Sequence, residues 1–452
     1  MKRYRWLLGC CLFLSIGMLW AADEPDLRML QQKAAQSRDM EGYVGVCKYL
    51  YQTEENPELL LLYADSIHQL ATKSKKPEQL VEYYIWASEG NFIKGDFQQG
   101  YALKRKAIAL AEKVGLKFAI SQSCCDMGYY CNVDARYDSA RYYFRKGLEA
   151  GEDLSEAGEA CRTMLTNYAS SFLFEGKTDS ALVYTIRASE RSAADKDTAM
   201  LIENLNQLGT IYRRKKDLEN CIANFEQALH LCELRGNHNA VAFIYGNIAT
   251  AYCDWNRPGD AIPFSEKAVE YALKTGNKRR IGTCYVNLGA IQTRLVQMRA
   301  EGIATLLKAI PILEEVNDRR LLCDAYNYLV NAYRMDGNLN QAMYYLQKLD
   351  KLAHEMQTDA ERFRYYQAKA GLLQESKKYT EAIVYYRRII DMLRSGYKDT
   401  RDYEHYKRLA ECYLAVNNSS QAYEYLTQAY ALRDSAFHTE QTEQLSEYSV
   451  KY

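Results

Sequence analysis

The sequence contains little proline, little histidine and no excess of either charge. Six prolines among 452 residues leave room for long uninterrupted helices, because proline breaks a helix interior. The six histidines form no HExxH pair, and the chain has no GxGxxG, GxxxxGK[ST] or GxSxG motif. These absences exclude the usual sequence signatures of zinc proteases, nucleotide-binding enzymes and serine hydrolases. We therefore expect no enzymatic activity, no cofactor and no metal site.

Charge and cysteine spacing exclude two further classes of protein. The 58 basic residues balance 58 acidic residues without forming a basic stripe, so direct nucleic-acid binding is not expected. The numerous carboxylates are expected on solvated helix faces. The 13 cysteines include no CxxC pair, which argues against a zinc ribbon or a thioredoxin-like site. Most of them are predicted to be small core residues.

The first 22 residues differ from the rest of the chain. A basic start with Lys2, Arg3 and Arg5 precedes the apolar run WLLGCCLFLSIGML and the small residues Ala21 and Ala22. This pattern predicts a secretory signal peptide, and the run is short for a membrane span. We expect a periplasmic protein with no transmembrane span in the mature chain.

A period of about forty residues runs through the rest of the chain. Within this period, two series of mostly small residues recur. One series comprises Gly100, Ala140, Ala181, Cys221, Ala261, Gly302, Ala342, Ala382 and Ala422, and the other comprises Gly128, Ala169, Gly209, Ala249, Gly289, Val330, Ala370 and Ala410. Each unit is predicted to hold two helices that cross at these residues. A helical glycine costs about 1 kcal/mol relative to alanine, so Gly128, Gly209 and Gly289 indicate close helix packing. Pro311 and Gly302 predict a local irregularity in their unit.

Three segments in the same phase carry a family resemblance. LNQLGTIY at residues 205–212, YGNIATAY at 245–252 and YVNLGAIQ at 285–292 resemble the tetratricopeptide repeat. The period is longer than the usual 34 residues of that family, and its closing proline is missing. The resemblance implies an all-α solenoid, a right-handed superhelix of about nine to ten helix pairs with a concave face lined by the first helices.

The expected organisation has four parts: a signal peptide at 1–22, N-terminal helices with a weak first repeat at 23–80, a repeat array at 81–430, and a capping or connecting helix at 431–452. In the last part Leu445, Tyr448 and Tyr452 follow helical spacing. This apolar stripe resembles the segment that leads into a connecting helix in sensor proteins, and a short capping helix is the alternative.

The candidate binding residues lie on the first helices. They are Asn167, Asn206, Asn247, Asn287 and Asn327, which recur once per unit, together with Arg213 and Arg334. An asparagine amide both donates and accepts, so it matches a peptide backbone, and an arginine can pair with a ligand carboxylate. The alternative is that the asparagines bond to neighbouring helices or to their own backbone.

The functional hypothesis is binding of a peptide or protein ligand on the concave face. The long repeats resemble the periplasmic regions of Bacteroidetes-type histidine kinases and membrane-bound transcription regulators. That resemblance implies the sensory part of a signalling protein with an inner-membrane signalling partner. A freestanding periplasmic scaffold for envelope protein complexes is the alternative.

Overall fold

The computed structural model describes residues 27–53, 56–356, 358–397, 399 and 402–434. These residues form helices and turns and contain no strand, so the all-α prediction is confirmed. The predicted signal peptide and the stripe at Leu445, Tyr448 and Tyr452 lie outside the described residues. No helix in the described part is both long and apolar enough to cross a membrane.

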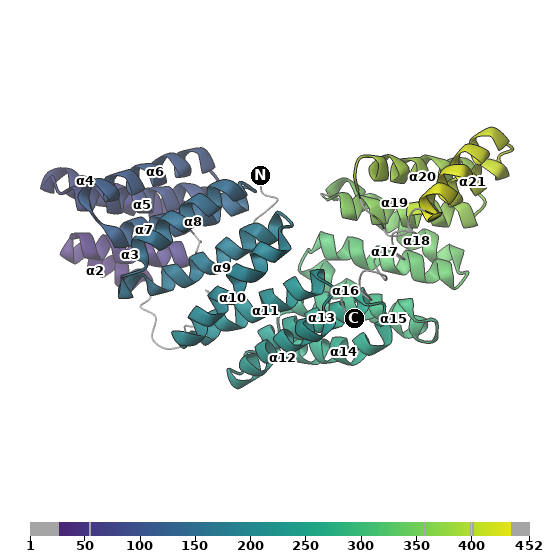
Figure 1. The fold of residues 1–452 in the computed structure, drawn as a ribbon, viewed down its shortest axis with the longest axis horizontal. Helices are drawn as coiled ribbons and strands as arrows, with labels where there is room; N and C mark the ends of the chain where they lie inside the picture. Colours follow the sequence, from purple (N-terminus) through teal and green to yellow (C-terminus); the bar gives the residue numbers. More distant parts are fainter. Residues whose placement is uncertain (1–26, 54–55, 357, 398, 400–401, 435–452) are drawn as a thin grey trace, which may run out of the picture. The chain divides into compact units, whose positions relative to one another are not determined.

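The chain divides into two compact units, unit 1 up to Ala240 and unit 2 from Val241 (Figure 1). The helices of unit 1 are α2 (Leu27–Ser37), α3 (Met40–Thr53), α4 (Pro57–Ser74), α5 (Pro77–Lys94), α6 (Phe97–Val114), α7 (Lys117–Val133), α8 (Tyr137–Gly151), α9 (Gly158–Phe174), α10 (Thr178–Ala194), α11 (Thr198–Arg214) and α12 (Leu218–Leu234). A short 3-10 turn, Ser155–Ala157, precedes α9.

Helix α13 (His238–Asp254) contains the boundary between the units. Unit 2 continues with α14 (Pro258–Thr275), α15 (Lys278–Arg294), α16 (Arg299–Glu315), α17 (Arg319–Met335), α18 (Leu339–Leu352), α19 (Asp359–Glu375), α20 (Tyr379–Arg394) and α21 (Asp402–Ala415). Residues 419–434 are also helical. Short turns separate these helices, as at Gly276 and Gly337, which both have positive φ angles.

Successive helices pack in pairs, such as α5 with α6, α7 with α8 and α15 with α16 (Figure 1). From α5 onward the odd-numbered helices are the first helices of the repeats. Several of them also contact the next first helix, as α7 does with α9, α15 with α17, and α17 with α19. We call the first helices of each unit, taken together, its first-helix layer. No repeat buries its apolar residues alone, so neighbouring repeats stabilise one another.

Aspartate and asparagine side chains begin many of these helices. The Asp197 carboxylate accepts a hydrogen bond from the Met200 backbone N–H at 3.0 Å, and Asn277 caps α15 in the same way through the Arg280 N–H. Such a cap satisfies one of the backbone donors that a helix start leaves without an internal partner.

Gly128, Gly209 and Gly289 lie where the two helices of a repeat approach closely. A Cβ added at Gly128 would lie 2.3 Å from the Phe144 ring of α8. One added at Gly289 would lie 2.7 Å from Leu306 Cγ and 3.0 Å from the Gly302 carbonyl oxygen. The predicted packing reason is therefore confirmed, and at Gly128 the space is taken by an aromatic ring rather than by a second backbone.

The repeat containing Gly302 has the predicted irregularity. Its two helices are joined by a 3-10 turn at Val296–Met298, and Leu295 at the end of α15 is extended. Helix α16 remains continuous although Pro311 lies inside it. The distance along the chain from the start of α15 to the start of α17 is consequently one residue longer than the forty residues that separate α13 from α15.

Nearly all of the described cysteines and some of the tyrosines are buried in the helical core. The eleven cysteines of the described residues are unbridged, and all but Cys253 are buried, which confirms their role as small core residues. Among the tyrosines of the second helices, Tyr345 and Tyr386 are buried, whereas Tyr142 and Tyr344 are 50% and 48% exposed.

Candidate functional site

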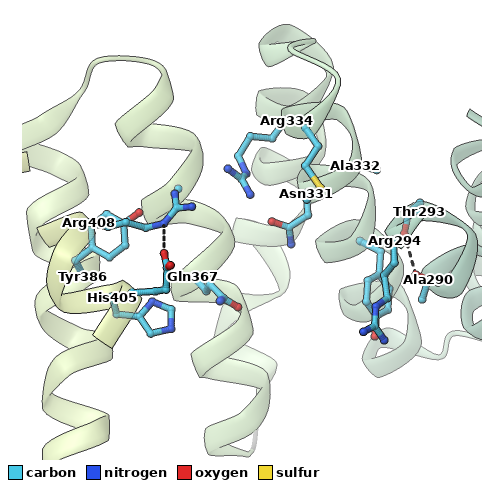
Figure 2. Close-up of a pocket in the computed structure, with 14 residues that line it drawn as sticks. Ala290, Thr293, Arg294, Asn331, Ala332, Arg334, Gln367, Tyr386, His405 and Arg408 are labelled. Carbon is cyan, nitrogen blue, oxygen red and sulfur yellow. Dashed lines mark hydrogen bonds and ion pairs between the residues drawn. The ribbon is translucent and has the colours of Figure 1, made fainter. Parts of the chain in front are cut away.

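Unit 2 contains a cavity of about 480 Å³ on its first-helix layer (Figure 2). This volume lies within the range typical of ligand pockets. Its lining comes from α15, α17, α19, α20 and α21, and consists of Ala290, Thr293, Arg294, Tyr328, Asn331, Ala332, Arg334, Met335, Gln367, Gly371, Tyr386, Glu404, His405 and Arg408. Because four successive first helices contribute, the cavity exists only when the repeats are stacked.

Three arginines give the cavity its charge. In Figure 2 the guanidinium groups of Arg334 and Arg408 point toward one another. The Arg408 Nε lies 4.0 Å from Glu404, and Arg334 pairs with Glu375 of α19. The Arg334 Nε is buried and has no hydrogen-bond partner among the described residues. Arg334 therefore keeps donor capacity that its ion pair does not use.

Amide and phenol groups add neutral polar atoms to the cavity. The Asn331 amide donates to both the Asn327 side-chain oxygen at 3.2 Å and the Asn327 carbonyl at 3.1 Å. The Tyr386 hydroxyl donates to Gln374 Oε1 at 2.7 Å. Burial is the main cause that raises the pKa of Tyr386 to about 12, so this phenol is a neutral hydrogen-bonding group at physiological pH.

His405 lines the cavity, but its side chain is held by contacts within the protein. Its side chain is buried, its Nε2 lies 2.9 Å from Asp399 Oδ2, and its ring meets the Phe363 ring edge to face at 5.4 Å. No group of three or more His, Cys, Asp or Glu side chains that could hold a metal ion occurs among the described residues.

The cavity owes part of its volume to Gly371 on α19. A Cβ at this position would meet the Arg334 guanidinium at 3.5–3.6 Å, which is an ordinary contact. Alanine would therefore fit, whereas a longer side chain would enter the space beside Arg334. Gly371 lies in the interior of α19, where it lowers helix propensity.

The structure places the predicted asparagines in two different helix positions. Asn167, Asn247 and Asn287 are each the tenth residue of their helix, whereas Asn206 and Asn327 are each the ninth. Asn167 and Asn327 are buried, Asn206 and Asn247 are half-buried, and Asn287 is exposed. One residue corresponds to a rotation of about 100° around a helix. The five side chains consequently do not form one ladder along the first helices.

Of the seven predicted residues, Arg334 lines the cavity, and Asn327 reaches it through Asn331. Arg213 occupies the equivalent place in α11, one residue before the helix end, and is half-buried. The sequence interpretation missed Arg294, Gln367 and Arg408. Gln367 could have been found, because it is the ninth residue of α19 and so stands where Asn206 and Asn327 stand in their helices.

A second charged cluster, which we call the buried ion network, lies in unit 1. Lys104 of α6 is fully buried and pairs with Glu89 of α5. Its Nζ also lies 3.0 Å from Asp126 Oδ2, and the Tyr130 hydroxyl donates to Glu89 Oε2 at 2.8 Å. The expectation that carboxylates lie on solvated faces is wrong for Glu89, because a cation of a neighbouring helix compensates its burial.

Burial is the main cause that raises the pKa of Glu89 to about 7, opposed by the Lys104 ammonium. Asp126 and Glu89 together raise the pKa of Lys104 against the opposing effect of its burial. Each charge in this network has a partner within hydrogen-bond distance. The network is therefore closed, and its arrangement is that of a structural contact between α5, α6 and α7.

Comparison with known proteins finds a family match for part of the chain. Residues 200–274 match the tetratricopeptide repeat family. A search of curated proteins found no match to this sequence.

Several solved structures share the fold. One is a signal-transduction ATPase with numerous domains and a tetratricopeptide repeat sensor from Pyrococcus horikoshii, with 15% identity and a TM-score of 0.53 over 87% of this chain and 55% of that one. Aspartyl phosphate phosphatase F from Bacillus subtilis has 13% identity and a TM-score of 0.51 over 74% and 96% of the two chains. The quorum sensor NprR from B. thuringiensis, in its apo form, has 15% identity and a TM-score of 0.50 over 78% and 97%. At these identities the similarity establishes the fold alone.

Proposed function

Because this chain is built from tetratricopeptide repeats, we propose that it binds a peptide or protein segment in the cavity of unit 2. The observation that carries the proposal is the composition of that cavity. Amides and guanidinium groups of successive first helices, together with the Tyr386 phenol of α20, line one space of about 480 Å³. Hydrogen-bond donors and acceptors contributed by successive repeats suit an extended chain, which presents its own polar groups along its length.

The proposed setting is outside the cytoplasm, with the chain acting as the sensory part of a signalling system. The basic start, apolar run and small residues of positions 1–22 support export. Two proteins of the same fold are named as sensors, one carrying a tetratricopeptide repeat sensor and one a quorum sensor. In this proposal the cavity receives the signal, catalysis plays no part, and an inner-membrane protein transmits the response.

The test is to fill the cavity without changing the fold. Gly371→Leu places a branched side chain beside Arg334, whereas Gly371→Ala keeps the cavity open because its Cβ makes ordinary contacts. The purified chain is immobilised and exposed to pools of random hexapeptides, and retained peptides are counted by mass spectrometry. We expect at least tenfold lower retention with Gly371→Leu and unchanged retention with Gly371→Ala.

Circular dichroism serves as the control, since both substitutions should retain the helical signal. Equal retention by all three proteins would place peptide binding elsewhere on the chain. An absence of retained peptides on the unsubstituted chain would contradict the proposed function itself.

A further inference from the structure

Glu203 of α11 carries a carboxyl group without a partner inside the protein. It forms no hydrogen bond or ion pair with any of the described residues. Its side chain is half-buried, so a ligand from solution can reach it. Burial alone raises the pKa of Glu203 to about 8, and no charged side chain of α9, α10 or α12, which pack against α11, opposes this effect. The free protein therefore holds Glu203 largely neutral at pH 7, because its surroundings do not compensate the ionised form.

A second unsatisfied acceptor lies one turn further along α11. Gln207 follows Glu203 by four residues, so the two side chains lie on the same face of the helix. Gln207 Nε2 donates to Ser170 Oγ of α9 at 2.8 Å, and the Ser170 hydroxyl donates to the Thr166 carbonyl at 3.0 Å. The orientation of the Gln207 amide is thereby fixed, because Ser170 has a single proton to donate. The remaining atom, Gln207 Oε1, is buried and accepts no hydrogen bond from the described residues.

Unit 2 shows how the protein treats a carboxylate at the same helix position. Glu203 is the sixth residue of α11, and Asp324 is the sixth residue of α17. Asp324 Oδ1 lies 2.8 Å from Arg364 Nη2, and Arg364 is the sixth residue of the next first helix, α19. The sixth residues of α9 and α13 are Thr163 and Phe243. The first helices before and after α11 in the chain thus provide no cation at this position.

Two explanations without a ligand account for part of this arrangement. A water molecule could donate to Gln207 Oε1, and a neutral Glu203 could be a purely structural residue. Glu203 does not donate to Gln207 Oε1, which is left without a hydrogen bond among the described residues. Neither explanation provides a counterion for Glu203, whereas Asp324 has one in Arg364.

We propose that Glu203 and Gln207 form a site in unit 1 for the primary ammonium group of a ligand. The Glu203 carboxylate is the counterion, and Gln207 Oε1 is a second acceptor. An ammonium group has three donors that point in different directions, so it can bridge two acceptors on successive helix turns. A guanidinium group is planar and suits a single carboxylate better. On binding, the Glu203 carboxyl releases its proton to solvent and accepts an N–H donor of the ligand. The inference does not depend on binding in the cavity of unit 2.

The ammonium group has two sources, a lysine side chain or the amino terminus of a peptide. Three pools of hexapeptides with uncharged flanking residues separate them. The first pool has blocked ends and a fixed central lysine. The second has blocked ends and a central norleucine, which has a similar stem without the charge. The third has the central norleucine and a free amino terminus. Retention on the immobilised full chain is measured at pH 7, 8 and 9 against the second pool.

We expect the lysine pool to be retained about tenfold more than the blocked norleucine pool at pH 9, as a charge-assisted hydrogen bond implies. At pH 7 this preference should be several-fold smaller, because only about a tenth of Glu203 is ionised when its pKa is about 8. If the ligand group is an amino terminus, the third pool is preferred instead. That preference should be strongest near pH 8, because an α-amino group itself loses its proton at about pH 7.7–8.0.

Glu203→Gln should remove the preference and its pH dependence. Glutamine matches the neutral acid in shape, so the helical circular-dichroism signal should be retained. Glu203→Asp keeps the charge on a shorter stem and should restore part of the preference. The matched control is Glu226→Gln, which removes an exposed carboxylate of α12. Gly371→Leu, which fills the cavity of unit 2, should also leave the preference unchanged.

The inference is overturned by equal retention of the three pools at every pH. A preference that persists in Glu203→Gln would place the ammonium site elsewhere, and one that is lost equally in Glu226→Gln would indicate nonspecific charge attraction. A preference that disappears in Gly371→Leu would assign it to the cavity of unit 2. Each of these results contradicts the site at Glu203, and none of them contradicts peptide binding in unit 2.

Discussion

The two units differ in how they arrange their clusters of charged side chains. In unit 1, Lys104 is fully buried and its ammonium contacts Glu89 and Asp126, so these charges compensate one another within the protein. In unit 2, Arg334 and Arg408 line a cavity together with Glu404, the partner of Arg408, whereas Glu375, the partner of Arg334, lies outside the lining. Repeats of the same kind thus carry two kinds of charge cluster. The one in unit 1 joins neighbouring helices, and the one in unit 2 faces a space large enough for a ligand.

This difference follows from side-chain size at the contacts between repeats. Around Lys104 large side chains fill the space, and the Phe92 and Tyr130 rings stack with centroids 3.7 Å apart. Around Arg334, small residues such as Ala332 and Gly371 leave the space open. A charge cluster becomes structural where the core closes over it, and it is available to a ligand where the core does not.

The largest expected effect is the loss of the Lys104 ammonium. At pH 8, Lys104→Ala leaves the buried Glu89 and the half-buried Asp126 without their shared cation, and we expect a loss of about 3–5 kcal/mol in local stability. Hydrogen exchange of the α5–α7 backbone amides measures it, since repeat proteins can unfold in segments.

The matched substitution in unit 2 is Lys369→Ala. Lys369 pairs with Asp350 at 2.8 Å, and the two side chains are 15% and 37% exposed. We expect Lys369→Ala to lose about 1 kcal/mol of local stability, because water and salt already screen this ion pair. Comparable losses in the two variants would show that the buried ion network is no more structural than an ion pair at the surface.

The pH dependence of unit 1 should be the next largest effect. The pKa of Glu89 is about 7 in the folded chain and close to 4.3 when unfolded. Between these values the folded state binds the extra proton, so stability falls as the pH rises and levels off above about pH 7. The groups that face Glu89 are Tyr51 from α3, Lys104 from α6, and Asp126 and Tyr130 from α7.

Glu89→Gln removes this titration while Asp126 still neutralises Lys104. Melting temperatures of both proteins are compared from pH 4.5 to pH 8. As the pH rises over this range, we expect the free energy of unfolding of the unsubstituted chain to fall by on the order of 2 kcal/mol more than that of Glu89→Gln. Parallel curves would mean that the ammonium keeps Glu89 ionised throughout.

Replacing two helical glycines by alanine should change the stability by smaller amounts and in opposite directions. Gly128→Ala would place a Cβ 2.3 Å from the Phe144 ring, whereas Gly246→Ala on α13 would meet nothing within 4 Å. We expect Gly128→Ala to lose about 1–2 kcal/mol through overpacking and Gly246→Ala to gain about 0.5–1 kcal/mol through helix propensity. Urea unfolding measures both, and stabilisation by Gly128→Ala would contradict the packing argument.

Local sequence signals predicted the helices but not the charge clusters. Turn residues indicate where helices end, and the glycines Gly128 and Gly289 indicate where helices cross. Both signals are visible in the sequence because they depend on the type of residue at one position. In the run Lys104, Arg105, Lys106 only the first is buried, and nothing in the run distinguishes it. Its burial depends on Glu89 and on residues of another helix.

The candidate site was predictable to a similar extent. Arg334 was found from its repeat position, because a solenoid brings equivalent positions of successive units together. The cavity also needs Arg408 and the small Gly371 from later helices, and no single repeat encodes that combination. The asparagine series extends across the longer unit around Gly302, so a step of forty residues does not keep Asn327 in the helix position of Asn287.

The smallest expected effect on stability distinguishes the two roles considered for the asparagines. Asn287 is exposed, so Asn287→Ala should change the free energy of unfolding by less than about 0.5 kcal/mol. The Asn327 side-chain oxygen accepts from the Asn331 amide, so Asn327→Ala should lose about 1 kcal/mol and release an amide that lines the cavity. Urea unfolding and peptide retention are measured on the same samples. Weaker retention in Asn287→Ala at unchanged stability would assign it to the ligand. Unchanged retention would restrict ligand contacts to the cavity residues, and it would make Asn327 a residue that positions Asn331 rather than one that touches the ligand.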